Sequence, residues 1–112
     1  MNCAEDGISS NKKIDTLGEY LRNLRLTTYN KGKKRFGFTQ KELSRALKSL
    51  SDKQGLEGIS VSPSYISTIE KGFIDVSIGV LLIFEIFFEI ESGTLASIIS
   101  KQIMSQQKKK VG

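Results

Sequence analysis

Apolar residues recur at intervals of three and four along most of this chain, and no run alternates convincingly at an interval of two. The first spacing lines apolar side chains along one face of an α-helix, whereas a half-buried strand needs the second. The sequence therefore predicts an all-α fold. Its first helix is predicted over residues 14–28, where the apolar positions are Ile14, Leu17, Leu21 and Leu24.

Residues that start and stop helices set the bounds of the other helices. Thr39 and Glu42 form a capping box, in which each side chain bonds the other residue's amide, and the helix behind it reaches about Lys53. Ser62 and Pro63 start a third, short helix. Gly72 ends the third helix. Ser77 starts the fourth helix, which reaches about Glu91, and Ser92 or Thr94 starts the fifth.

A chain of 112 residues holds one domain with one hydrophobic core. We interpret residues 14–105 as this domain, residues 1–13 as a flexible arm and residues 106–112 as a basic tail. The first residues form no apolar run typical of a secretory signal, and the most apolar stretch is too short to span a membrane. We therefore expect a cytoplasmic protein.

The composition excludes several kinds of chemistry. The chain has no histidine, which removes histidine acid–base catalysis, Ser-His and Cys-His nucleophile pairs, and histidine-containing zinc sites. A lone cysteine, Cys3, closes no internal disulfide. We therefore expect no enzymatic activity, no metal and no cofactor, and no small-molecule ligand is evident.

Positive charge is concentrated in the first half of the chain. Residues 12–53 hold 12 basic and 4 acidic side chains, whereas residues 54–91 hold one basic and 6 acidic side chains. A segment with this much positive charge is suited to bind phosphate groups. The alternative interpretation is a charged surface that contacts only solvent. The loop expected over residues 29–38 carries cations that we interpret as phosphate contacts, or alternatively as a flexible solvated group: Lys31, Lys33, Lys34 and Arg35.

The second and third helices form a helix-turn-helix pattern. A helix as short as the third cannot hold itself in water, so a neighbouring helix must support it through Ile66 and Ile69. This support leaves its outer face free. That face carries Ser64, Tyr65 and Thr68, whose hydroxyls can approach bases or phosphates, or can simply fill a helix surface.

Four segments, in order, resemble the Cro/repressor type of helix-turn-helix regulators, the xenobiotic-response-element family. Leu17–Arg25 is similar to its first helix, and Phe38–Ser44 (FTQKELS) to the L-T-Q-x-E-L-A opening of its second. Ser62–Gly72 is similar to its S-x-x-x-I-S-x-I-E-x-G recognition helix, and Ser77–Leu95 to its fourth helix and the start of its fifth. The resemblance covers about residues 14–100 and implies a five-helix, lambda-repressor-like DNA-binding domain.

The resemblance also implies roles for single residues. Ser64, Tyr65 and Thr68 match base-reading positions, while Gln40 and Ser62 match phosphate contacts, with Gln40 also bracing the recognition helix. Independently of the resemblance, nearby basic side chains would neutralise further phosphates, namely Lys41 and an extra basic patch of Lys31, Lys33, Lys34 and Arg35 that departs from the family pattern.

A buried ion pair between Arg25 and Glu70 is implied as well, joining the first helix to the end of the third. The sequence supports this pair independently, because Glu70 adjoins apolar Ile69, where an unpaired carboxylate is costly. The alternative is a solvated Glu70.

The chain departs from the family pattern within the recognition unit. Pro63 stands where relatives often place a base-reading polar side chain, so sequence preference leans on DNA shape. The turn over about residues 51–61 is far longer than the family's usual turn of about three or four residues. This length could shift the third helix relative to Gln40.

The fourth helix is apolar on nearly every side, with Glu85, Glu89 and Ser92 as its polar stripe. Such a helix must be covered by a second copy of the chain or, alternatively, by the arm or the long loop of the same chain. The dimer interpretation assigns the interface to Ile83, Ile86, Phe87 and Ile98. A twofold dimer presents two recognition helices about 34 Å apart to a near-palindromic operator.

Together these observations predict a cytoplasmic, sequence-specific regulator that binds double-stranded DNA as a dimeric repressor and docks residues 62–71 in the major groove. The alternative is an antitoxin-type or adaptor protein that uses the same fold for protein–protein interaction. A steep loss of DNA affinity with rising salt would distinguish the regulator from the adaptor.

Overall fold

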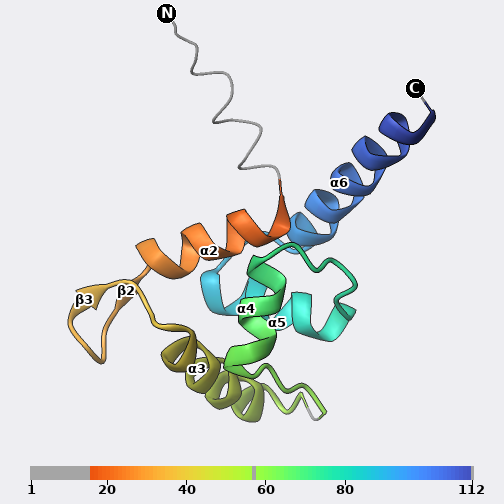
Figure 1. Cartoon of the computed structure of the whole chain (residues 1–112). Coiled ribbons are helices and arrows are strands. Elements are labelled where there is room, and N and C mark those ends of the chain that lie inside the picture. Colours follow the sequence, from red (N-terminus) through yellow and green to blue (C-terminus); the bar gives the residue numbers. More distant parts are fainter. Residues whose placement is uncertain (1–15, 57, 112) are drawn as a thin grey trace, which may run out of the picture.

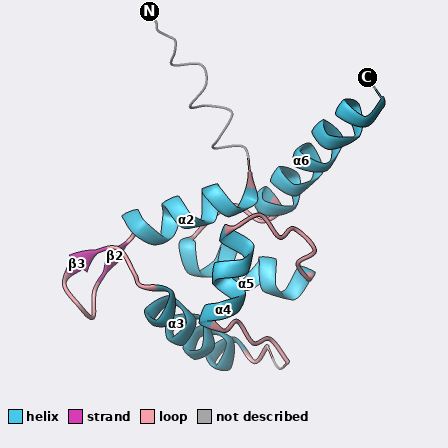
Figure 2. Cartoon of the chain, in the orientation of Figure 1, coloured by secondary structure: helices cyan, strands magenta, loops and turns pink. Residues whose placement is uncertain are grey.

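The computed structural model describes residues 16–56 and 58–111, with side chains up to residue 105. These residues form five helices and one pair of short strands (Figure 2). The elements are α2 (Leu17–Thr27), β2 (Tyr29–Asn30), β3 (Arg35–Phe36), α3 (Gln40–Gln54), α4 (Pro63–Glu70), α5 (Ile78–Phe88) and α6 (Thr94–Val111). The predicted arm over residues 1–13, with Cys3, lies outside the described residues.

The helices share one hydrophobic core. Helix α4 lies between α2 and α3 and contacts both, while α5 packs on α3 and α6, and the start of α6 returns to α2 (Figure 1). The helical architecture predicted from the apolar spacing is therefore confirmed. The largest side chains that are completely buried come from all five helices: Leu17, Leu43, Leu47, Ile66, Ile69, Ile83, Phe84 and Leu95.

The predicted caps start the helices where the sequence places them. The Thr39 hydroxyl accepts the Glu42 amide at 3.0 Å, and the Glu42 carboxylate accepts the Thr39 amide at 2.9 Å, which completes the capping box of α3. The hydroxyls of Ser62 and Ser77 likewise accept amides in the first turns of α4 and α5. Helix α3 ends at Gln54, and the capping residue after it, Gly55, has a left-handed φ of 70°, which favours glycine.

The segment predicted as a loop over residues 29–38 contains a small antiparallel hairpin, which corrects the purely helical expectation. Tyr29 pairs with Phe36 and Asn30 with Arg35. The Asn30 side chain accepts the Lys33 amide at 3.2 Å and so fastens the turn. Strands of two residues are too short to show the alternation by which a strand is recognised in a sequence.

The fourth predicted helix ends earlier than expected, and the fifth ends later. Helix α5 stops at Phe88 rather than near Glu91, because Glu89 takes a left-handed conformation with a φ of 57°. Helix α6 continues to Val111, through most of the segment interpreted as a basic tail. None of the described helices combines the length and the apolarity needed to cross a bilayer.

Glu85 was expected on a polar stripe with Glu89, but it is buried. Its carboxylate accepts the amides of Gly93 and Leu95, both at 3.0 Å, at the start of α6. Those amides have no carbonyl partner within their own helix, so the carboxylate replaces it and adds favourable negative charge at the helix N-terminus. The early end of α5 allows the chain to reverse and bring α6 to this carboxylate.

Candidate nucleic-acid interface

Helix α4 is held against α2 by direct backbone contact. A Cβ atom at Gly18 would lie 2.5 Å from the Ile69 carbonyl oxygen and 2.7 Å from that of Glu70. Real Cβ atoms do not approach backbone atoms so closely, so only glycine permits this crossing. The C-terminal end of α4 therefore has a fixed position on α2.

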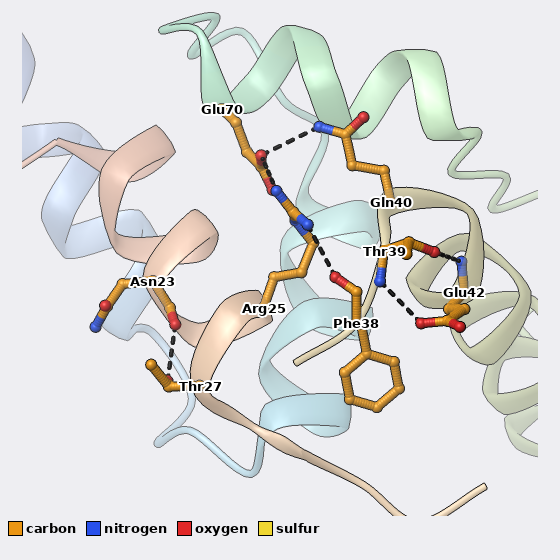
Figure 3. A network of polar contacts seen from close by, with 8 residues as sticks. All are labelled: Asn23, Arg25, Thr27, Phe38, Thr39, Gln40, Glu42 and Glu70. Carbon is orange, nitrogen blue, oxygen red and sulfur yellow. Dashed lines mark hydrogen bonds and ion pairs between the residues drawn. The ribbon is translucent and has the colours of Figure 1, made fainter. Parts of the chain in front are cut away.

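Arg25 and Glu70 form a bidentate ion pair across the same crossing. The Arg25 Nε donates to one Glu70 oxygen at 2.6 Å and Nη2 donates to the other at 2.8 Å (Figure 3). Arg25 Nη1 also donates to the Phe38 carbonyl at 2.8 Å. The side chains are only 9% and 6% exposed, so the pair joins α2, α4 and the chain before α3 within the interior. The structure thus has the pair that the resemblance implied.

Gln40 adds the first turn of α3 to this network. Its Nε2 donates to Glu70 Oε1 at 3.2 Å, so that one carboxylate oxygen accepts from both Arg25 and Gln40 (Figure 3). The hydrogen bond by which Gln40 was predicted to brace the recognition helix, here α4, is therefore present.

The long connector between α3 and α4 is tied to α3 at both ends. The Ser51 hydroxyl donates to the Leu56 carbonyl at 2.7 Å, and the Ser44 hydroxyl donates to the Val61 carbonyl at 2.6 Å. The second bond fixes the residue directly before Ser62, the cap of α4. The extra length of the connector consequently does not release α4 from the N-terminus of α3.

The outward side of α4 forms one wall of an open groove against the start of α3. Ser64 and Thr68 are exposed, while Tyr65 is half-buried with its ring against the edge of Phe73. We name the surface of Ser64, Tyr65 and Thr68 the hydroxyl face. The groove is lined by Gln40, Pro63, Ser64, Ser67, Thr68 and Lys71.

Hydrogen bonds within α4 already engage part of the hydroxyl face. The Thr68 hydroxyl donates to the Ser64 carbonyl at 3.0 Å, so its proton is used within the helix. Within the described residues, the structure gives no hydrogen bond of the Ser64 hydroxyl to the protein. Ser64 therefore offers a donor and acceptors to a ligand, whereas Thr68 offers its methyl group and a lone pair.

Cations border the groove and form a second group on the hairpin. Lys71, at the end of α4, is exposed and lines the groove, and Lys41 is exposed directly after Gln40, which also lines it. Lys71 was not singled out in the sequence, where its place directly after Glu70 was the only signal. Lys31, Lys33 and Lys34 are exposed on the hairpin turn, away from α4.

Arg35 is not as free as the three hairpin lysines. Its Nη2 donates to Glu42 Oε1 at 2.8 Å, the oxygen that also accepts the Thr39 amide. The bond from the Thr39 backbone and the adjacent Arg35 guanidinium hold the pKa of Glu42 below its ordinary value of 4.5. Glu42 thus fastens the hairpin to α3, a second role that the capping box alone did not indicate.

One residue of the predicted dimer interface is wrong. Ile83 has no exposed surface within a single chain, because it packs in the core, so it cannot contact a second copy. Ile86, Phe87 and Ile98 are half-buried, and the Phe87 ring lies edge-on to Phe38.

The chain's own long loop supplies part of the cover over α5. Ile59 lies so close to Gly79 that a Cβ there would be 3.0 Å from it. The larger apolar side chains of α5 that remain exposed are Ile78, at 74%, and Leu82, at 37%. Any apolar association surface on α5 therefore centres on these two residues.

Comparison of the chain with protein-family models, characterised proteins and solved structures finds no match.

Proposed function

We propose that this chain is a sequence-specific regulator that binds double-stranded DNA, a helix-turn-helix protein of the Cro/repressor type. In this proposal α3 and α4 are the helix-turn-helix unit, and α4 is the recognition helix. The observation that carries the proposal is the hydroxyl face of α4, where Ser64 and Thr68 are exposed and which the Arg25–Glu70–Gln40 network holds against α2 and α3.

The dimensions of α4 suit the major groove of B-DNA. A helix of eight residues is about 12 Å long, and the groove admits an α-helix with its side chains. Because α2 and α3 hold α4 from the sides that carry Ile66 and Ile69, its opposite side is free to enter. Among the residues that the structure describes, those lining the groove beside it include no acidic side chain.

The engaged and free hydroxyls suggest different kinds of base contact. Ser64 can donate to or accept from a base edge. Thr68, whose proton is bonded to the Ser64 carbonyl, would present its methyl group, which suits the methyl of thymine. Tyr65 extends the apolar part of the face.

The start of α3 would contact the phosphates that border the groove. Its first turn carries partial positive charge from free backbone amides, and Gln40 and Lys41 lie in that turn. Ser62 is exposed at the start of α4, and Lys71 at its end adds a cation on the same groove. Contacts of this kind set the register of α4 on the duplex without reading its sequence.

We further propose that two copies associate, so that paired α4 helices read a near-palindromic operator and exclude other proteins from it. Ile78 and Leu82, with the half-buried Ile86, Phe87 and Ile98, replace the earlier assignment that included Ile83. Two recognition helices about 34 Å apart would meet successive major grooves on one side of the duplex.

Selection from a randomised pool of duplexes by the full chain tests the proposal. The wild type is expected to enrich a common sequence. The double variant Ser64→Ala with Thr68→Ala should prefer that sequence about tenfold less than the wild type, or less still, while its thermal unfolding stays nearly unchanged. The matched control, Ser97→Ala with Ser100→Ala, removes two exposed hydroxyls from α6 and should retain the preference.

An adaptor that uses this fold only for protein contacts is the competing function. Pro63 in the groove and the lack of long hydrogen-bond donors on the hydroxyl face favour it. An adaptor would enrich no duplex sequence, and salt would not change its affinity for DNA in the steep way that phosphate contacts require.

A further inference from the structure

The hairpin of residues 29–36 has two faces of opposite character. Tyr29 lies directly opposite Phe36, and Asn30 lies directly opposite Arg35. Because neighbouring residues of a strand point to opposite sides, the two aromatic rings share one face and the two polar side chains share the other.

The polar face is attached to the protein. Asn30 is buried, and its Nδ2 donates to Glu42 Oε1 at 3.4 Å. Arg35 donates to the same oxygen at 2.8 Å. The hairpin is thus an ordered projection anchored on the first turn of α3, and its orientation is set by Glu42.

The aromatic face is left in water. Phe36 is 71% exposed and Tyr29 is 46% exposed, and their rings meet edge to face with centroids 5.1 Å apart. This pair lies beside the exposed lysines of the turn, Lys31, Lys33 and Lys34, and the hairpin itself has no acidic residue. Cations around an exposed aromatic ring suit a polyanion that also has apolar surfaces, which describes nucleic acid better than an average protein surface.

The anchor also fixes where the hairpin lies relative to α4. Gln40 and Glu42 are two residues apart in the first turn of α3, so their side chains leave the helix about 200° apart. Gln40 points to Glu70 at the end of α4 (Figure 3), whereas Glu42 accepts a hydrogen bond from Arg35 of the hairpin. The order in space is therefore α4, then the start of α3, then the hairpin, in agreement with Figure 1.

This order matches the succession of grooves on a duplex. If α4 occupies the major groove and the start of α3 meets the phosphate strand beside it, the next feature past that strand is the minor groove. The hairpin lies on that side. The exposed lysines of its turn suit a groove that is lined on both sides by phosphates.

We propose that residues 29–36 form a second DNA-binding element, which enters the minor groove next to the half-site. Lys31, Lys33 and Lys34 would bind the phosphates on its two sides, and Phe36 would make the apolar contact inside it. The proposal rests on the proposed function and adds to it a preference for base pairs that α4 does not touch. Since the minor groove distinguishes A·T from G·C mainly by the guanine amino group, that preference is for pairs lacking this group.

Inosine gives a direct test, because an inosine·cytosine pair has the minor groove of A·T and the major groove of G·C. Duplexes enriched by the wild-type chain are rebuilt with A·T, G·C or inosine·cytosine pairs in the flank next to each half-site. The full chain should bind the A·T and inosine·cytosine flanks equally, and both about tenfold more tightly than the G·C flank.

Phe36→Ser should bind all three flanks equally and yet keep the core preference read by α4. The matched control, Met104→Ser, removes an apolar side chain that is 58% exposed but lies on α6, outside the residues proposed for DNA contact and association, and should leave the flank preference intact. Thermal unfolding of both variants is expected to match the wild type, because neither side chain is buried.

Four outcomes would overturn the proposal. If inosine·cytosine behaves as G·C, the flank is read through the major groove. If Phe36→Ser keeps the wild-type flank preference, or the wild type has none while it still selects a core sequence, the hairpin is no DNA element although the proposed function stands. If the wild type enriches no duplex at all, the proposed function fails together with the hairpin.

Discussion

Two arginine–glutamate pairs of this chain have nearly equal bond lengths and opposite surroundings. Arg25 meets Glu70 at 2.6 Å with both side chains less than a tenth exposed, whereas Arg35 meets Glu42 at 2.8 Å with 45% and 20% exposed. The buried pair orders α4, and the exposed pair orders the hairpin. Bond length alone thus says little about how much each pair contributes to the stability of the fold. Solvent screens the Arg35–Glu42 pair but not the Arg25–Glu70 pair.

The largest expected difference between the regions comes from removing one member of the buried pair. Glu70→Ala leaves Arg25 charged and unpaired in the interior, and also removes the partner of Gln40. We expect a loss of about 3–5 kcal/mol in the free energy of unfolding, measured by urea denaturation.

The double variant Arg25→Met with Glu70→Met sharpens this comparison. It removes both charges from the interior and should lose less stability than Glu70→Ala alone. A loss below about 1 kcal/mol for Glu70→Ala would show that the pair is as well screened as a surface pair.

A glycine in each region gives the next largest contrast. Gly18→Ala forces a methyl group against the Ile69 and Glu70 carbonyls and should cost about 1–3 kcal/mol, because backbone cannot move aside cheaply. Gly32→Ala meets only the end of the Asn30 side chain, at 3.6 Å, and should be close to neutral. Thermal unfolding of the two variants measures the contrast, and equal losses would mean that α2 and α4 are not in close contact.

Removing the exposed pair should have a smaller effect. Arg35→Ala is expected to lower the free energy of unfolding by less than about 1 kcal/mol, and by less still in high salt, since the guanidinium is nearly half exposed. Urea denaturation at low and high salt measures this. A loss as large as that of Glu70→Ala would contradict the distinction between the two pairs.

The smallest expected effect is a pH dependence at Glu42. Because its pKa is lowered in the folded chain, by the Thr39 backbone bond first and by Arg35 second, its contribution is present above the ordinary value of 4.5 and is lost as pH falls through the folded value. The urea midpoint of Glu42→Gln should therefore fall less than that of the wild type as the pH is lowered from neutral to below 4.5. An identical decline would show that the carboxylate gains nothing from these partners.

Local signals in the sequence were sufficient to locate the helices. Caps and apolar spacing located all five helices, since both depend on residues within one or two turns of each other. The first helix begins at Leu17, after the Thr16 cap, rather than at residue 14, because Thr16 takes an extended conformation and its hydroxyl accepts the Glu19 amide. The contact of Arg25 with Glu70 followed from the family resemblance, supported by the cost of an unpaired carboxylate beside Ile69.

Features that depend on distant segments were not predictable in this way. Glu85 is bonded to amides at the start of the next helix, and the hairpin is anchored by a residue that was already assigned to a cap. Ile83 was placed at a dimer interface because an apolar helix does not reveal which of its sides the rest of the chain covers. Its burial depends on tertiary packing that no local pattern contains.

The ratio of affinities for two duplexes tests the central claim most directly. The wild-type chain is titrated with its enriched duplex and with a scrambled duplex of the same composition, over a series of salt concentrations. A sequence-reading α4 predicts a ratio of about a thousand or more that persists while both affinities fall with salt. A ratio near one at every salt concentration would contradict it.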